Sequence, residues 1–236
     1  MKKISWVTHK DYDIPLPENH KFTASKFSDL YNELKTSDFY HRAKILSPKK
    51  ASVDEVSICH DLDYVLKIKN GTLSDKEIRR LGFKWSETLS NRSFLAVNGT
   101  LLTCKEAIKN GIANHLAGGT HHSHRDFGSG YCVFNDLAYA SLHLIRTHQV
   151  KKILIFDTDV HQGDGTASIL KDNDKIFTCS IHCKNNFPFR KSISDMDVEL
   201  DDNLSLIHIS EPTRPERISD SVFCVKKKSG GGGGGG

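Results

Sequence analysis

The segment FDTDVHQGDG, residues 156–165, follows the apolar run Ile153, Leu154 and Ile155, and it limits the possible folds more than any other stretch. A short apolar run of this kind, bounded by turn residues, is typical of a strand buried on both faces of a parallel sheet. Parallel strands need long crossover connections, which are usually helices. The segment therefore predicts an α/β protein with polar side chains placed directly after a buried strand.

Strand-like and helix-like segments alternate along the first 203 residues. Short apolar runs predict strands over residues 4–8, 112–116, 152–156 and 175–182. Between them, helices are predicted to begin at Thr23, Ser74, about Ser86 and Asn135 or Asp136. We expect a single domain, a three-layer α/β/α sandwich with a central parallel sheet and helices on both of its faces.

Three of the predicted helices have specific end or break signals. Ser74 and Glu77 have the spacing of a capping box, and this helix should stop at Gly82. The helix capped by Thr23 carries apolar residues at helical spacing, namely Phe27, Leu30, Tyr31 and Leu34. The helical stretch over residues 86–109 is predicted to break at Asn98 and Gly99.

The composition is that of an ordinary soluble protein, with 37% apolar and 26% charged residues among 236. The formal charge of +4 is small and the basic residues are scattered, so we expect neither a nucleic-acid nor a membrane partner. No apolar segment is long enough to span a bilayer, and MKKISWVTH at the amino terminus lacks the apolar stretch of a signal peptide. Six cysteines without a CxxC pair argue against a zinc ribbon and a disulfide framework. A cytoplasmic location is the simplest expectation.

Asp157, Asp159 and His161 lie at every second position after the buried run. On an extended backbone these three side chains point the same way. Two carboxylates held close together repel each other unless a cation lies between them, and a carboxylate with an imidazole suits zinc. A single Asp or His at a strand end is more often a helix cap or a satisfied core residue. The three residues in phase, followed by Gly163, Asp164 and Gly165, favour a metal site instead.

A second cluster, GGTHHSH, contains the adjacent His121 and His122 in a glycine-flanked loop. Two neighbouring imidazoles can present different protonation states to one small molecule, which suits acid–base catalysis. An incidental histidine cluster is the alternative, because the HH pair is a weak signal by itself. Both clusters follow predicted strands, and ligands of parallel α/β sheets bind beyond the carboxyl ends of the strands.

Three motifs together carry a family resemblance: GGTHHSHRDFGSGYCVFND, ILIFDTDVHQGDGT and FTCSIH. This combination resembles the zinc-dependent histone deacetylase family of the arginase/deacetylase superfamily, over about residues 1–203. Within that family it is most similar to bacterial members that are like the class IV deacetylases. YDIPLPENHKF and GTLSDKEIRRLGF also resemble that group.

The resemblance implies a role for each matching residue. Asp159 and His161 match two of three zinc ligands, and His121 and His122 match the tandem histidines that orient and deprotonate a zinc-bound water. The carboxylates that hydrogen-bond these histidines are matched by Asp157 and Asp164. Gly130 and Tyr131 match the floor and the aromatic wall of the acyl-lysine tunnel. A monovalent cation site, usually for potassium, is matched by Asp157, Ser180 and the backbone of Asp159, His161 and Ile181.

These roles imply a mechanism and a class of partner. Zinc would polarise an amide carbonyl and acidify a bound water, and His122, with His121 as its partner, would take a proton and later return one to the leaving amine. The expected substrate is an acyl-lysine protein or a small acylated amine. Acetylated polyamines and longer acyl chains are open alternatives, and the oligomeric state is not predicted.

The segment from Leu204 onward has no helical or strand period and ends in seven glycines. SLIHISEPTRPE resembles a translated sequencing adapter, and the glycine run resembles a poly-G base-calling artefact; a natural flexible tail is the alternative. We therefore expect residues 204–236 to be non-native or disordered, and residues 1–203 to be a partial deacetylase-like domain that lacks its last strands and helices.

The family's third zinc ligand, an Asp, and its oxyanion-stabilising Tyr have no match in this sequence. The polypeptide as written is therefore expected to be inactive and poorly folded, whereas its full-length parent is expected to be an enzyme. A non-catalytic acyl-lysine-binding pseudoenzyme is the alternative in another functional class. A binuclear-manganese ureohydrolase is a further alternative, and the HH pair argues against it.

Overall fold

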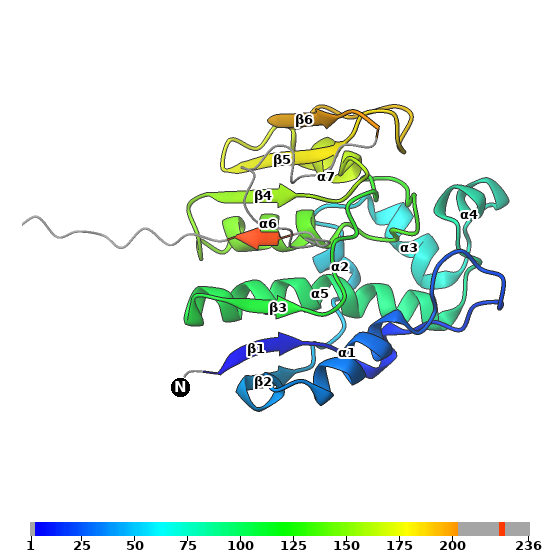
Figure 1. Cartoon of the computed structure of the whole chain (residues 1–236). Coiled ribbons are helices and arrows are strands. Elements are labelled where there is room, and N and C mark those ends of the chain that lie inside the picture. Colours follow the sequence, from blue (N-terminus) through cyan, green and yellow to red (C-terminus); the bar gives the residue numbers. More distant parts are fainter. Residues whose placement is uncertain (1–2, 203–221, 225–236) are drawn as a thin grey trace, which may run out of the picture.

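A computed structural model describes residues 3–202 of the chain and, for the backbone alone, residues 222–224. Seven strands form two sheets in this part of the chain (Figure 1). The first sheet has the order β2-β1-β3, and all its strands are parallel: β1 Ile4–Val7, β2 Ala43–Leu46 and β3 Ala113–His115. The second has the order β6-β5-β4-β7, with β4 Ile153–Asp157, β5 Ile176–Cys183, β6 Met196–Leu200 and β7 Val222–Cys224. The parallel pairing of β4 with β5 and of β5 with β6 confirms the predicted α/β architecture.

Strand β7 differs from the expectation for the tail, which contained no predicted strand. Its residues pair antiparallel with β4, and Leu154 lies opposite Cys224. Valine and phenylalanine favour strands, and the free edge of β4 offers unpaired backbone groups. The prediction for the rest of the tail, residues 203–221 and 225–236, lies outside the described residues.

Seven α-helices and two short 3₁₀ turns connect the described strands. The helices are α1 Lys26–Thr36, α2 Val53–Val56, α3 Leu62–Asn70, α4 Asp75–Leu81, α5 Glu87–Asn110, α6 Asp136–Arg146 and α7 Asp164–Leu170. The 3₁₀ turns are η1 Lys10–Tyr12 and η2 Tyr40–Arg42. Within the described part of the chain, none of these helices is long and apolar enough to cross a membrane.

Two of the predicted caps are confirmed and one is wrong. Ser74 and Glu77 form the reciprocal capping box of α4, which ends at Gly82 in the left-handed conformation, with φ of 85°. Asn135 caps α6 by accepting a hydrogen bond from the Ala138 amide. Helix α1 begins after Ser25 rather than Thr23, and the Ser25 side chain makes no capping hydrogen bond. The Asp13 carboxylate instead accepts a hydrogen bond from the Ser28 amide of its first turn.

Helix α5 runs without a break through Asn98 and Gly99, against the prediction. The Asn98 side chain donates to the Lys49 carbonyl 2.9 Å away, so it does not compete for the helix backbone. A Cβ atom at Gly99 would collide with the Tyr12 hydroxyl and the His115 ring. Tertiary contacts therefore explain both residues inside the helix.

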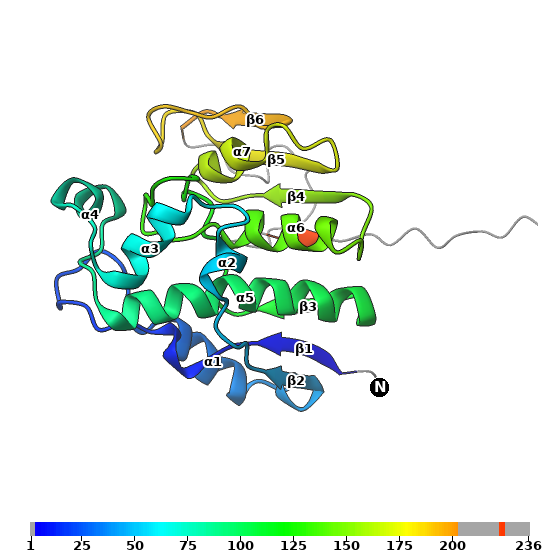
Figure 2. The same cartoon turned by 180° about the vertical axis from the view of Figure 1, so that it is seen from behind.

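The hydrophobic core lies between the sheets and the helices that cover one of their faces, and Figure 2 shows α5, α6 and α7 on that face. Ile153 and Ile155 of β4 and Ile176 of β5 point into this core. Among the described residues, no helix covers the opposite face of β4, β5 and β6, which differs from the expectation of helices on both faces (Figure 1). Leu154, Phe177 and Met196 on that face are 41%, 47% and 50% exposed.

Candidate functional site

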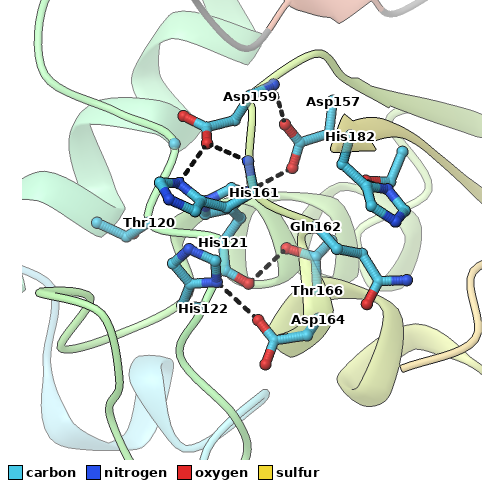
Figure 3. Close-up of polar contacts among 12 residues, drawn as sticks. Thr120, His121, His122, Asp157, Asp159, His161, Gln162, Asp164, Thr166 and His182 are labelled. Atoms are coloured by element: carbon cyan, nitrogen blue, oxygen red, sulfur yellow. Dashed lines mark hydrogen bonds and ion pairs between the residues drawn. The ribbon is translucent and has the colours of Figure 1, made fainter. Parts of the chain in front are cut away.

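The loop between β4 and α7 carries the Asp and His residues that the sequence analysis singled out. Strand β4 ends at Asp157, so Asp159 and His161 lie in the loop and not on an extended strand as predicted. The turn is fixed by side chains: Asp157 Oδ1 accepts from the Asp159 amide at 3.0 Å, and Asp159 Oδ1 accepts from the His161 amide at 2.8 Å. The turn brings His161 Nδ1 to 2.9 Å from Asp159 Oδ1 (Figure 3). The Asp159 and His161 side chains therefore meet because side-chain hydrogen bonds bend the backbone into a turn, and not because residues alternate along a strand.

The tandem histidines reach the same place from the loop that follows β3. His121 Nδ1 lies 2.6 Å from Asp157 Oδ2, and His122 Nδ1 lies 2.7 Å from Asp164 Oδ1 (Figure 3). Both histidines are 4% exposed, and their ring centroids are 4.0 Å apart. The His122 ring centroid is also 5.6 Å from that of His161. Two buried His–Asp pairs thus lie side by side, next to Asp159 and His161.

The carboxylate partners determine which ring nitrogen carries the proton. An ionised carboxylate only accepts hydrogen bonds, so Nδ1 of each histidine is the donor. The Nε2 atom of a neutral His121 or His122 is then left with a lone pair. Each ring is thereby prepared to accept a proton at Nε2.

The two histidines differ in their electrostatic surroundings. Burial lowers the pKa of His122, and together with repulsion from His121 it outweighs the hydrogen bond and the charge of Asp164, which act to raise that pKa. Burial also opposes the charged form of His121, but the charge and hydrogen bond of Asp157 raise its pKa above the ordinary value. The surroundings of the two neighbouring histidines therefore shift their pKa values in opposite directions.

Both acidic groups remain ionised, although Asp164 is buried and Asp159 is partly buried. Burial acts to raise the pKa of Asp164, but hydrogen bonds from His122 and His124 lower it to about 2. The pKa of Asp159 is also lowered, because hydrogen bonds from His161 and the positive charge of His121 outweigh burial. Both carboxylates are therefore available as hydrogen-bond acceptors or metal ligands across the physiological pH range.

Two glycines allow the loops to approach this closely. A Cβ atom at Gly163 would lie 2.5 Å from Asp157 Oδ2, which holds His121. At Gly165 a Cβ atom would collide with the backbone carbonyl of Ser123, one residue after His122. The glycines of the QGDG segment are thus explained by the contact between the first turn of α7 and the histidine loop.

Buried polar residues anchor the histidine loop from α6 and α7. The Asn135 side chain donates to the Ser123 carbonyl at 3.1 Å and to Thr166 Oγ1 at 3.0 Å. Asp136, which is fully buried, accepts from the Thr120 amide at 2.7 Å and from its hydroxyl at 2.6 Å. The loop backbone is therefore held on both sides of His121 and His122.

Two residues of the predicted monovalent cation site, Ser180 and Ile181, lie on the neighbouring strand β5. Ser180 of β5 pairs in register with Asp157 of β4, and Ile181 follows it. Ser180 is 3% exposed, and its hydroxyl lies 3.0 Å from His182 Nδ1. Within the described residues, Nε2 of the buried His182 has no hydrogen-bond partner. Ser180 thus lies beside Asp157, but its hydroxyl is already hydrogen-bonded to His182.

Gly130 and Tyr131, the predicted tunnel residues, both have positive φ values, of 53° and 64°. Gly130 lies against the His122 ring, and a Cβ atom there would come within 2.7 Å of it. The Tyr131 ring packs instead with Phe22 and Phe83, at centroid distances of 5.7 and 5.1 Å. The structure therefore brings Gly130 to the histidines and Tyr131 to an aromatic cluster around Gly82.

The sequence analysis missed two residues of the site. The Phe187 ring meets His122 edge to face at 4.9 Å and His161 at 6.0 Å. His124 Nε2 lies 2.9 Å from Asp164 Oδ2, the oxygen that His122 does not use. The third histidine of THHSH was a visible signal for His124, whereas the position of Phe187 depends on the fold of the segment after β5.

The donors at Asp159 and His161 have the right chemistry for zinc, which binds carboxylate oxygen and imidazole nitrogen. Catalytic zinc sites ordinarily have three protein ligands. Across residues 3–202, no group of three or more His, Cys, Asp or Glu side chains has the arrangement of a metal site. The described residues therefore fit two ligands of such a site.

Known proteins share sequence similarity with this chain. A model of the histone deacetylase domain matches residues 20–219. An uncharacterized protein of Picosynechococcus sp. is 41% identical over 84% of this chain and 66% of its own length. Acetoin utilization proteins AcuC of Staphylococcus xylosus and Bacillus subtilis are 34% and 32% identical, over 61% and 70% of this chain. The chain spans 40% and 45% of their lengths.

A solved structure shares the fold. The crystal structure of the HDA15 HD domain superimposes with a TM-score of 0.66 over 80% of this chain and 56% of that chain. At 19% sequence identity this likeness concerns the fold alone. It confirms the predicted arginase/deacetylase-like architecture.

Proposed function

We propose that this protein, which belongs to the histone deacetylase family, removes acetyl or other acyl groups from lysine or lysine-like amines by zinc-dependent hydrolysis. Membership of the family, first inferred from the motifs, makes a hydrolase the expected class. One observation carries the proposal: two buried His–Asp pairs lie side by side, next to an Asp and a His that suit zinc. The dependence on zinc, the kind of acyl group and the substrate are proposals that go beyond membership of the family.

Asp159 and His161 would hold the zinc ion together with a ligand from outside the described residues. When bound, zinc would polarise the acyl carbonyl and acidify a water molecule. His122 Nε2 would accept the proton of the attacking water and then deliver one to the leaving amine, so that water and amide yield carboxylate and amine. Asp164 supports this role by keeping the other proton of His122 on Nδ1. His121, with its raised pKa, is the neighbour that would hold a proton at the same time.

The surroundings of His122 support an extended alkyl chain as the group that enters the site. The Phe187 ring and the backbone of Gly130 both lie against His122. An aromatic face and a residue without a side chain form a narrow apolar wall, which suits the methylene chain of lysine. We propose an acyl-lysine protein or a small acylated amine, such as an acetylated polyamine, as the substrate. A potassium ion near Asp157, Ser180 and Ile181 belongs to the same proposal.

The test compares two proteins. One is the 236-residue chain, and the other is the product of the reading frame obtained by long-read sequencing of the source DNA across codons 199–206. We expect the second to release acetate from an acetyl-lysine reporter and to bind one zinc ion. His122→Ala should lower its kcat/KM by about 10²- to 10⁴-fold, the usual contribution of a general base. His41→Ala, on an exposed residue, is the matched control.

Unchanged turnover in the His122→Ala protein would contradict the proposal. Asp159→Ala and His161→Ala should each abolish stoichiometric zinc binding, measured by metal analysis after dialysis. A zinc-loaded and active 236-residue chain would refute the expectation that this polypeptide is inactive. The cytoplasmic location stays a prediction, which cell fractionation would check.

The second candidate is a non-catalytic binder of acyl-lysine. It is favoured because no group of three or more His, Cys, Asp or Glu side chains in the described part of the chain has the arrangement of a metal site. Calorimetry with an acetyl-lysine peptide separates the candidates, because a binder gives heat of binding and leaves the acetyl group intact. If the glycine tail is really encoded in the source DNA, this second candidate becomes the better account.

A further inference from the structure

His124 forms a second side-chain contact with Asp164. Its Nε2 atom lies 2.9 Å from Oδ2, whereas His122 Nδ1 lies 2.7 Å from Oδ1. Asp164 is 5% exposed, so nearly all its hydrogen bonding comes from protein groups. The other pair is built differently, because the second oxygen of Asp157 accepts from the backbone amide of Asp159. Only the carboxylate behind His122 is held between two imidazoles in this way among the described residues.

The neighbouring residues fix the position of the His124 ring. It stacks on Phe127 with a centroid distance of 4.5 Å and an angle of 20° between the planes. The Arg80 guanidinium lies 4.2 Å from the centroid of the same Phe127 ring. The His124 amide donates to the Phe127 carbonyl at 2.9 Å, which closes the loop between the two rings. His124 is 17% exposed at its side chain, so the stack leaves it little freedom to rotate.

This loop is also attached to the helical layer. The Arg125 carbonyl accepts from the Asp61 amide at 2.9 Å, and the Arg125 side chain forms an ion pair with the Asp61 carboxylate at 3.3 Å. His60 Nδ1 contacts the same carbonyl at 3.2 Å. A rigid support of this kind is what a group needs if it is to hold another group in one orientation.

We propose that His124 is a positioning residue of the deacylase site, and that its Nε2–H holds Asp164 in the orientation that presents Oδ1 to His122 Nδ1. The inference rests on the proposed function for its effect on turnover. Without this donor, a buried carboxylate oxygen would be left unsatisfied, which is costly, and the carboxylate would turn toward water or other donors. His122 would then lose the partner that directs Nε2 at the reacting water. Partners of this kind typically contribute about 10- to 100-fold to activity in related metal sites.

Two substitutions separate the hydrogen bond from the packing. His124→Phe keeps a ring to stack on Phe127 and removes the donor. In His124→Gln the amide nitrogen lies about as far from the backbone as Nε2, so the donor is kept and the ring is lost. In the protein from the longer reading frame, we expect His124→Phe to lower kcat about 10-fold with KM within about twofold, and His124→Gln to recover most of the loss. Phe127→Leu, which removes the stacking partner and keeps the donor, is the matched control.

A readout that does not need turnover is the Nδ1 proton of His122, observed by nuclear magnetic resonance in ¹⁵N-histidine-labelled protein. We expect a low-field resonance for this shared proton in the original protein and in His124→Gln, and its loss or upfield movement in His124→Phe. The spectrum is recorded on the 236-residue chain as well as on the longer protein. If His124→Phe fails to fold, His124→Asn replaces it, because its shorter amide reaches only the position of Nδ1.

The outcomes distinguish the two proposals. A longer protein without deacylase activity overturns the proposed function, while the His122 resonance still reports whether His124 controls this pair. A His124→Phe protein with unchanged kcat and an unchanged His122 resonance overturns the positioning role. So does a His124→Gln protein as slow as His124→Phe, because packing would then be the reason for the loss.

Discussion

His121 and His122 are neighbours in the chain, and their carboxylate partners come from opposite ends of one loop. Asp157 is the last residue of β4, and Asp164 is the first of α7. The pKa of His121 is raised and that of His122 is lowered, although both rings are buried. A general acid–base pair needs such a difference, because one group has to accept a proton while the other retains one.

Replacement of Asp164 by Asn tests this at a single residue. Asp164 raises the pKa of His122 through its hydrogen bond and its charge, so Asp164→Asn should lower that pKa further. The acidic limb of the pH–rate profile should then move to lower pH, and kcat should fall about 10- to 100-fold. Asp172→Asn, on an exposed residue, is the control. A limb that moves to higher pH would contradict the assigned electrostatics.

His60 gives a prediction about stability. It is 1% exposed, its Nε2 accepts from the Asn135 amide at 2.9 Å, and burial lowers its pKa to about 4. In the unfolded chain its pKa is about 6.5, so between these values the unfolded state binds more protons and stability falls as pH falls. The loss should approach roughly 3 kcal/mol of unfolding free energy by pH 4. Urea unfolding across this range should show a smaller loss for His60→Gln, which keeps a donor and an acceptor; equal losses would argue against a neutral buried His60.

At the scale of elements, the site depends on the contact between the first turn of α7 and the histidine loop. Thr166 of α7 donates its amide to the His121 carbonyl at 3.0 Å. This approach requires glycine at position 165, where a Cβ atom would collide with the Ser123 carbonyl. These contacts therefore hold the helix and the loop together, although 42 positions separate His122 from Asp164 in the chain.

Gly165→Ala tests this contact. Alanine favours a helix more than glycine does, so an isolated α7 would gain up to about 1 kcal/mol. In this protein the added methyl group would clash with the backbone carbonyl of Ser123. We therefore expect a net loss of about 1–3 kcal/mol in unfolding free energy. Thermal or urea unfolding measures it, with Ser168→Ala on the same helix as the control. A stabilised Gly165→Ala protein would mean that helix and loop are not in contact.

At the scale of the whole molecule, the two faces of the four-stranded sheet differ. Helices α6 and α7 cover one face, whereas Leu154, Phe177 and Met196 on the other are exposed in the described part of the chain. Neighbouring apolar side chains on one open sheet face form a patch of the kind that favours association or dye binding. The chain should therefore bind a hydrophobic dye while it retains its secondary structure.

A double substitution, Leu154→Thr with Phe177→Thr, tests the open face. Threonine keeps the preference for strands, so we expect dye fluorescence and self-association to fall while the midpoint of thermal unfolding stays the same or rises. Ile155→Thr, on the covered face at 2% exposure, should instead lower stability by about 1–3 kcal/mol. Equal effects of the two changes would show that both faces are covered.

The sequence by itself determined the α/β class, the capping box at Ser74, a helix start at Asn135 or Asp136, and the family. Each depends on residues close together in the chain, where spacing limits the possible geometry. Only the tertiary structure decided that α5 continues through Gly99, that Asp159 meets His161 in a turn, and that His124 shares Asp164 with His122. These contacts join segments that are far apart in the chain or bent by their own side chains, and no local periodicity records them.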